Sequence, residues 1–257
     1  MPLSPIDWHR RFTQQARWTR DLRAYLYPRV GFSKAERILD VGCGTGALLG
    51  EFQSQGDALV YGLDVQRAHL KLAQTNEAAL LSQGDAHQLP YPDSLFDITL
   101  CHYLLLWISN PTQALHEMVR ITRPGGAVLA LAEPDYGGRI DHPPELEQLG
   151  KWQIESLQAQ GADPFMGRKL AGLFNKVGLQ KVETGVLGAQ WQGAPSKEEW
   201  QSEWAVLEAD AELIKGIETL RGLKARAEQA WQSGNRVLFV PTFYALGWVS
   251  TRSVIPG

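Results

Sequence analysis

The fold of this protein follows from nine residues, Ile38-Leu39-Asp40-Val41-Gly42-Cys43-Gly44-Thr45-Gly46. An apolar run breaks there into three alternating glycines, which indicates a buried strand that ends in a tight turn. Glycine has no Cβ atom, so these glycines can adopt positive φ and let the backbone approach a ligand closely. We expect Thr45 to cap a following helix whose free N–H groups face the same crevice. The sequence therefore predicts a cofactor site at this turn.

Strands and helices alternate along the chain around this turn. The predicted strands are 37–41, 59–63, 80–83, 96–100, 127–132, 182–187 and 236–249, the last interrupted at Pro241. The predicted helices between them are 45–55, 66–77, 111–121 and 168–177. Continuous apolar strands alternating with amphipathic helices predict an α/β fold with a doubly wound, mostly parallel seven-stranded sheet covered on both faces. We expect the last strand to be antiparallel.

The length of 257 residues suits one domain, 1–257, that carries helical insertions. The net charge of −3 gives no overall basic field, so we expect no nucleic-acid partner. No stretch approaches the ~20 apolar residues of a membrane span, and we expect a soluble, cytoplasmic protein without membrane contact. The two cysteines, Cys43 and Cys101, lack metal-ligand spacing, so we predict no disulfide and no metal site.

Polar residues follow each predicted strand, at the edge where ligands bind in doubly wound sheets. Asp64 ends the second strand, about 20 residues after the first glycine, which is the spacing of a carboxylate that binds a ribose diol. Asp85 follows the third strand and could then bind an adenine amino group. The alternative for both carboxylates is ordinary capping of the next helix.

Four segments resemble, in order, the motifs of the class I S-adenosylmethionine-dependent methyltransferases, in the small-molecule branch that includes the enzymes of ubiquinone and menaquinone biosynthesis. They are ILDVGCGTG (38–46), YGLDV (61–65), GDAHQLPYPDSLFD (84–97) and ITRPGGAVLAL (121–131). The resemblance covers about the first half of the chain. Because four ordered motifs are more specific than a lone glycine loop, it implies a Rossmann-like methyltransferase fold, S-adenosylmethionine as cofactor and a small-molecule acceptor.

The resemblance also implies which residues bind each part of the cofactor. The methionine part would be surrounded by Asp40, Gly42, Cys43, Gly44 and Gly46. The adenosine part would contact Asp64 at the ribose, Val65 and Gln66 beside the adenine, and Asp85, Ala86 and His87 at the adenine edge. Cys101 would border the sulfonium.

The expected reaction is an in-line displacement in which a nucleophile of the acceptor attacks the sulfonium methyl group. His102, directly after the fourth strand, is the best placed catalytic base, since a neutral imidazole near its ordinary pKa of ~6.5 accepts a proton at physiological pH. A hydrogen-bonded structural histidine is the alternative. Tyr103 is a second catalytic candidate, followed by Glu133 and His87.

Two other function classes stay open. Gly42-x-Gly44-x-x-Ala47 also fits the dinucleotide fingerprint of NAD(P)-dependent oxidoreductases, although the chain has no Tyr-x-x-x-Lys pair. A non-catalytic S-adenosylmethionine-binding protein is the other, which a sealed pocket beside Cys101 and His102 would support. The fourth strand lacks the Asn/Asp-Pro-Pro-aromatic ending of enzymes that methylate base amino groups, so such methylation is disfavoured.

Three segments lie outside the minimal fold. We expect 1–36 to form a helical cover, and 133–165 and 190–235 to be helical insertions that form a substrate lid. The cover mixes arginines with aromatic residues, which favours a helix with a solvated basic face over contacts to an anionic substrate. The insertions contain Trp152, Trp191, Trp200, Trp204 and Trp231. These tryptophans indicate either a pocket for an apolar or aromatic acceptor or anchors between insertion and core.

Overall fold

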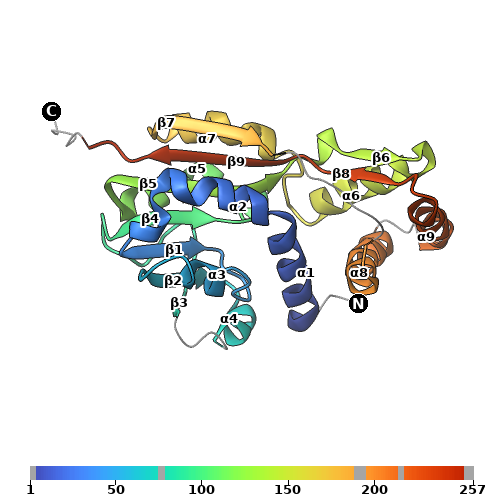
Figure 1. Ribbon diagram of the computed structural model, residues 1–257, viewed down its shortest axis with the longest axis horizontal. Coiled ribbons are helices and arrows are strands. Elements are labelled where there is room, and N and C mark those ends of the chain that lie inside the picture. The colour runs from blue at the N-terminus through green and yellow to red at the C-terminus, as the bar shows by residue number, and fades with distance from the viewer. Residues whose placement is uncertain (1–3, 75–78, 188–194, 214–216, 252–257) are drawn as a thin grey trace.

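A computed structural model describes residues 4–74, 79–187, 195–213 and 217–251, without the side chains of 210–218 (Figure 1). Its main sheet has seven strands in the order β3-β2-β1-β4-β5-β9-β7. They are β1 (Arg37–Val41), β2 (Leu59–Asp64), β3 (Leu80–Gln83), β4 (Phe96–Cys101), β5 (Thr122–Pro134), β7 (Gln180–Val186) and β9 (Thr242–Trp248). The four pairings among β1 to β5 are parallel, whereas β9 runs antiparallel to both β5 and β7. The predicted seven-stranded, doubly wound sheet with an antiparallel last strand is confirmed.

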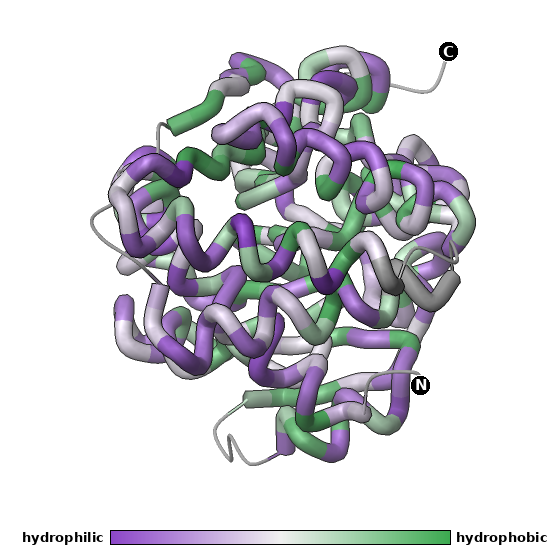
Figure 2. The backbone as a smooth tube through the Cα atoms, turned by 90° about the vertical axis from the view of Figure 1, so that its right-hand side faces the viewer, coloured by the Kyte–Doolittle hydropathy of each residue, from purple (hydrophilic) through white to green (hydrophobic). Residues whose placement is uncertain are grey.

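Helices cover both faces of the sheet because its strands are apolar on both sides. The helices are α1 (Pro5–Trp18), α2 (Arg20–Leu26), α3 (Leu49–Gln53), α4 (Arg67–Ala73), α5 (Pro111–Ile121), α6 (Glu147–Ala159), α7 (Leu170–Lys176), α8 (Lys197–Leu213) and α9 (Ile217–Gln232). Hydrophilic and hydrophobic residues alternate along the helices, as expected for helices with one buried side (Figure 2).

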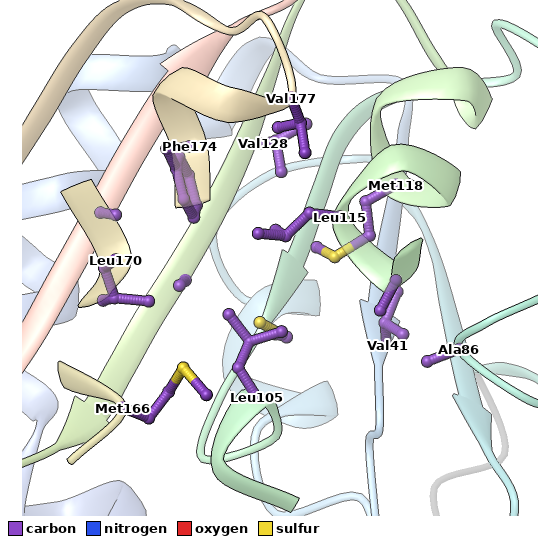
Figure 3. Packing of buried hydrophobic residues seen from close by; sticks show 14 of the residues in the cluster. Val41, Ala86, Leu105, Leu115, Met118, Val128, Met166, Leu170, Phe174 and Val177 are labelled. Atoms are coloured by element: carbon purple, nitrogen blue, oxygen red, sulfur yellow. The ribbon is translucent and has the colours of Figure 1, made fainter. Parts of the chain in front are cut away.

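Two buried clusters lie on the two faces of the sheet. One is formed by side chains of α5, α7 and the sheet, among them Leu115, Leu170 and Phe174 (Figure 3). The other includes Leu26 of α2 and Phe52 of α3. The core therefore fixes the strands between two helical layers and leaves their carboxyl ends free to form a site.

The antiparallel pair β5–β9 continues beyond the main sheet as a second pair, β6 (Ile140–His142) with β8 (Val237–Phe239). This pair carries α6, α8 and α9 at one end of the molecule (Figure 1). The three helices share a core of their own, whose buried members include Leu149, Trp204 and Leu220. The β6–β8 pair is not predicted from the sequence.

One local prediction about a helix start is wrong. Thr45 does not cap a helix, because α3 starts only at Leu49 and the Thr45 hydroxyl is 2.8 Å from Nδ1 of His9. The sequence also predicts a break in the helical stretch of the last insertion near Gly216 or Gly222. Gly216 lies outside the described residues, and Gly222 lies within α9. Within the described ranges, no helix is long and apolar enough to cross a membrane.

Candidate functional site at the carboxyl ends of the strands

The glycine turn after β1 has the backbone conformation that its sequence predicts. Gly42, Gly44 and Gly46 have φ of +76°, +54° and +79°. The turn is fastened to the neighbouring strand because the N–H groups of Gly42 and Cys43 donate to the carbonyl of Leu63, at 2.7 and 2.9 Å. The predicted positive φ of the three glycines is confirmed.

Helix α1 lies directly on this turn. A Cβ atom on Gly44 would stand 2.9 Å from the Phe12 ring, so only glycine fits beneath that side chain. Phe12 also packs edge-on against His69 of α4, with ring centroids 5.6 Å apart. The helix forms because Ser4 and Asp7 make a reciprocal capping box around Pro5. The N-terminal helix thus contacts the glycine turn from the solvent side.

Asp64 connects the glycine turn to the end of β2. Its Oδ2 accepts the N–H of Gly44 at 2.8 Å, and its Oδ1 accepts the N–H of Gln66 at 2.7 Å. The capping alternative is contradicted, since Gln66 and not Asp64 is the cap residue of α4. Each carboxylate oxygen retains a second lone pair, so Asp64 can still accept hydrogen bonds from a diol.

Asp40, at the end of β1, is a buried carboxylate with an unsatisfied oxygen. Among the residues with described positions, no hydrogen-bond partner reaches its Oδ1. Burial, together with the nearby charge of Asp64, raises the pKa of Asp40 well above its ordinary value. A cationic donor such as an ammonium group would satisfy this oxygen and favour the ionised form. The residue therefore fits the methionine end of the expected cofactor.

The third strand end carries Asp85, Ala86 and His87. Oδ1 of Asp85 accepts the N–H of His87 at 2.9 Å and lies 2.7 Å from the Nδ1 atom of that histidine, and these hydrogen bonds lower the pKa of Asp85. Asp85 cannot cap a helix, because no helix follows between β3 and β4. Ala86 is buried, whereas Val65 at the adjacent strand end is 61% exposed. An exposed valine beside two fixed carboxylates suits a flat apolar ring such as adenine.

His102 is held in a hydrogen-bond network at the end of β4. Its Nε2 lies 2.8 Å from the hydroxyl of Thr19, which also accepts a hydrogen bond from Arg23 at 2.6 Å. Burial, and then the charge of Arg23, lowers the pKa of His102 to about 3. The predicted near-ordinary pKa of this histidine is wrong, because the sequence does not reveal that α1 and α2 meet over it. The Thr19 contact favours the structural alternative.

Tyr103 has an unusual backbone and an enclosed side chain. Its φ is +52°, a conformation that residues other than glycine rarely adopt. Residues in such strained conformations cluster at functional sites. The ring lies edge-on to His102, with centroids 4.8 Å apart. Burial raises the pKa of Tyr103 above its ordinary value, although a hydrogen bond with Thr242 and the charge of Arg11 act in the opposite direction. The phenol is therefore neutral at physiological pH.

Glu133 supports the backbone that follows β4. Its carboxylate accepts the N–H groups of Leu104, Leu105 and Leu106, at 2.9, 2.7 and 3.1 Å. Burial raises the pKa of Glu133 to about 7 in spite of these bonds. Cys101 beside it is fully buried, and its thiol pKa is raised well above the ordinary value, so the sulfur is a neutral thiol. Sequence reasoning gave Glu133 only a minor catalytic role and missed this contact.

Two arginines of the N-terminal segment are buried, although the sequence predicts that its arginines lie on a solvated face. Arg23 forms a paired ion bridge to Glu51 of α3, with N–O distances of 2.7 and 2.5 Å. Arg11 is 8% exposed and lies in α1. Their positions on the apolar side of the helices are the signal that could have identified them. The face prediction is wrong for these two residues.

The tryptophans of the insertions pack mainly against each other and against the core that α6, α8 and α9 share. Trp204 is buried in the core of α6, α8 and α9, and Trp152 and Trp200 pack against it. Trp231 is half-buried in α9, and Trp191 lies outside the described residues. These contacts favour the anchoring alternative over an acceptor pocket. No group of three metal-ligating side chains occurs within the described ranges.

Comparisons with known proteins agree with this geometry. A family model described as "Methyltransferase domain" matches residues 39–130. Demethylmenaquinone methyltransferase of Geobacillus kaustophilus is 31% identical over 195 residues, which cover 67% of this chain and 81% of that protein. Malonyl-acyl-carrier-protein O-methyltransferase of Serratia marcescens is 39% identical over 97 residues, 37% of each protein.

Among solved structures, phosphoethanolamine N-methyltransferase 2 of Haemonchus contortus in complex with S-adenosyl-L-methionine has a TM-score of 0.59 at 17% identity, covering 90% of this chain and 52% of that one. The chain spans 37–55% of the length of three curated relatives that it matches. The relative from G. kaustophilus is matched over most of its length. The chain therefore belongs to the class I S-adenosylmethionine-dependent methyltransferases of the small-molecule type.

Proposed function

We propose that this protein transfers a methyl group from S-adenosylmethionine to a small-molecule acceptor. The observation that carries the proposal is the pair of buried carboxylates at the glycine turn. Asp64 holds the N–H of Gly44 at 2.8 Å, and Asp40 keeps one oxygen without a partner among the described residues. A ligand that brings both a diol and an ammonium group complements this pair.

The cofactor would be held by residues at three strand ends. Asp40 and the glycine turn would bind its methionine part, Asp64 its ribose, and Val65 with Asp85 its adenine. Gln66, Ala86 and His87 lie next to these groups. When bound, the cofactor supplies a methyl group on a sulfonium and a neutral thioether as the leaving group.

The residues of this chain contribute mainly by positioning the reactants and excluding water. Cys101 borders the reaction site as a neutral, fully buried thiol. His102 stays neutral, and with a pKa of about 3 it is a weak base, so its proposed part is to orient the acceptor beside Thr19. Tyr103, a neutral phenol in a constrained backbone, is the second proposed acceptor contact.

The acceptor would lie between α1, the residues after β4 and the β6–β8 extension. Residues 1–36 would cover the cofactor, and 133–165 and 190–235 would close over the acceptor. Aromatic residues support an apolar or aromatic acceptor, because Tyr103 and Tyr136 pack against the same buried cluster. No nucleic-acid or membrane partner is part of the proposal.

Calorimetric titration with S-adenosylmethionine, S-adenosylhomocysteine, NAD and NADP tests the cofactor. We expect micromolar binding of the two adenosyl-sulfur ligands and none of the dinucleotides. Binding of a dinucleotide alone would overturn the proposal in favour of an oxidoreductase. Binding of the sulfur ligands without methylation in a broad acceptor screen would favour a non-catalytic binding protein, an alternative that the methyltransferase relatives do not favour.

A further inference from the structure

Arg11 of α1 is a buried cation that has no anionic partner among the described residues. The residue is only 8% exposed. Its guanidinium stacks over the Trp18 ring at 4.8 Å from the centroid, and its hydrogen bond goes to the amide oxygen of Gln14 at 3.3 Å. Across the described part of the chain, no carboxylate lies within ion-pair distance of it. A guanidinium carries five N–H donors, and the hydrogen bond to Gln14 uses one of them.

Each of the other buried arginine side chains of the described residues contacts a carboxylate. Arg23 is paired with Glu51, while Arg139 and Arg236 share Asp141. A buried charge is costly unless it is paired, and an apolar side chain in place of Arg11 would avoid that cost. A buried arginine without a carboxylate partner among the described residues therefore indicates an anion that is supplied by a ligand.

The position of Arg11 connects it to the proposed acceptor site. Its guanidinium lies over the ring of Trp18, and the next residue, Thr19, contacts His102 after β4 at 2.8 Å. The adjacent Gln14 donates to the carbonyl of Glu199, which ties this part of α1 to α8 of the lid at 3.2 Å. The guanidinium thus lies where the cover, the lid and the end of β4 converge.

We propose that Arg11 binds a carboxylate group of the methyl acceptor. The inference rests on the proposed function and narrows its substrate class to small carboxylic acids with an apolar or aromatic body. A carboxylate matches the planar guanidinium with two parallel hydrogen bonds and neutralises one positive charge with one negative charge. A phosphate dianion would bring two negative charges to one guanidinium, so a carboxylate with a single negative charge is the better match.

Matched ligand pairs test this assignment by calorimetry on the full chain saturated with S-adenosylhomocysteine. The probes are benzoate and benzamide, indole-3-acetate and indole-3-acetamide, octanoate and octanamide, and phenyl phosphate. We expect at least one carboxylate to bind at least tenfold more tightly than its amide and than phenyl phosphate. Arg11→Gln should weaken the binding of that carboxylate at least tenfold and leave the affinity for S-adenosylhomocysteine unchanged. Arg17→Gln, an exposed arginine of the same helix, is the matched control and should change neither.

The outcomes separate the two proposals. Failure of S-adenosylhomocysteine to bind the unaltered protein would overturn the proposed function itself. If S-adenosylhomocysteine binds, three results would overturn only the role of Arg11. They are equal affinity for carboxylates and amides, equal carboxylate affinity in Arg11→Gln and the unaltered protein, and tighter binding of phenyl phosphate than of any carboxylate. The comparison of carboxylate with amide in the unaltered protein decides the question even if Arg11→Gln does not fold.

Discussion

Gly44 combines two constraints at a single residue, a positive φ and a ring directly above it. Gly44→Ala should destabilise the protein by about 1–3 kcal/mol and abolish S-adenosylhomocysteine binding, because the new methyl group meets the Phe12 ring in a strained backbone. Gly31→Ala is the matched control, since Gly31 has φ +65° and nothing within 4 Å. Urea unfolding and calorimetry measure both effects, and equal losses in the two variants would show that Phe12 contributes nothing.

The carboxylate of Asp64 has a role in both the loop and the ligand site. Asp64→Asn should weaken S-adenosylhomocysteine binding by about 1 kcal/mol or more, through loss of charge-assisted hydrogen bonds to the ribose. The exposed Asp57→Asn serves as control. Calorimetry on the two variants measures the difference. An unchanged affinity would mean that Asp64 only accepts the hydrogen bond from the N–H of Gly44 and does not bind the ligand.

His102 should remain neutral over the whole physiological range. Its pKa of about 3 predicts that its imidazole NMR signals keep the neutral position from pH 8 down to about pH 4.5. Comparison with His102→Gln assigns these signals. A titration near pH 6.5 would restore the histidine as a candidate general base and contradict the Thr19-bound arrangement.

At the scale of elements, Glu133 makes the segment after β4 sensitive to pH. Its folded-state pKa of about 7 exceeds the ordinary 4.5, so the folded protein binds this proton more tightly than the unfolded chain. The resulting stabilisation is full below pH 4.5 and is lost as the pH rises toward 7, by about 3 kcal/mol in total.

Urea unfolding of the unaltered protein and Glu133→Gln between pH 4.5 and 8 measures this loss. The glutamine does not titrate, so the stability difference between the two proteins should shift by about 3 kcal/mol over that interval. Subtracting one unfolding free energy from the other cancels the contributions of other titrating groups. His102 is one of these groups, and its lowered pKa makes the protein more stable as the pH rises. Parallel stability curves for the two proteins would contradict the raised pKa.

At the scale of the whole molecule, a buried charge cluster holds the β6–β8 pair together and reaches α6, where Arg139 donates to the amide oxygen of Gln153. Asp141 of β6 pairs with Arg139 at 2.5 Å and with Arg236 at 2.6 Å, and all three side chains are at most 5% exposed. Asp141→Asn should cost about 3–5 kcal/mol, because it leaves two buried guanidinium groups without their shared carboxylate.

An exposed ion pair between α8 and α9 provides the control for that substitution. Glu208→Gln removes the partner of Lys224, with side chains 36% and 48% exposed, and should cost at most about 1 kcal/mol. Urea unfolding of both variants gives the comparison. Equal, small costs would show that solvent reaches the Asp141 cluster.

The sequence alone determined the sheet and the glycine turn. The strand Arg37–Val41 is observed with its predicted bounds, and each of the seven segments predicted as strands contributes a strand to the main sheet. These features are readable because local periodicity reports which faces are buried, and because glycines at alternate positions report a backbone that needs positive φ. The choice of candidate cofactor residues follows from the same strand ends.

The tertiary structure alone decided which side chains meet. Thr19 binds His102 across 83 positions of sequence, and Asp141 meets Arg236 across 95. Such contacts depend on how helices and the β6–β8 ribbon pack against the sheet, which no local pattern encodes. For this reason the sequence placed the arginines of the first helices in solvent, whereas packing buried Arg11 and Arg23 and set the pKa of His102. Burial and charge pairing are properties of the assembled interior, because desolvation depends on every neighbour and not on the residue alone.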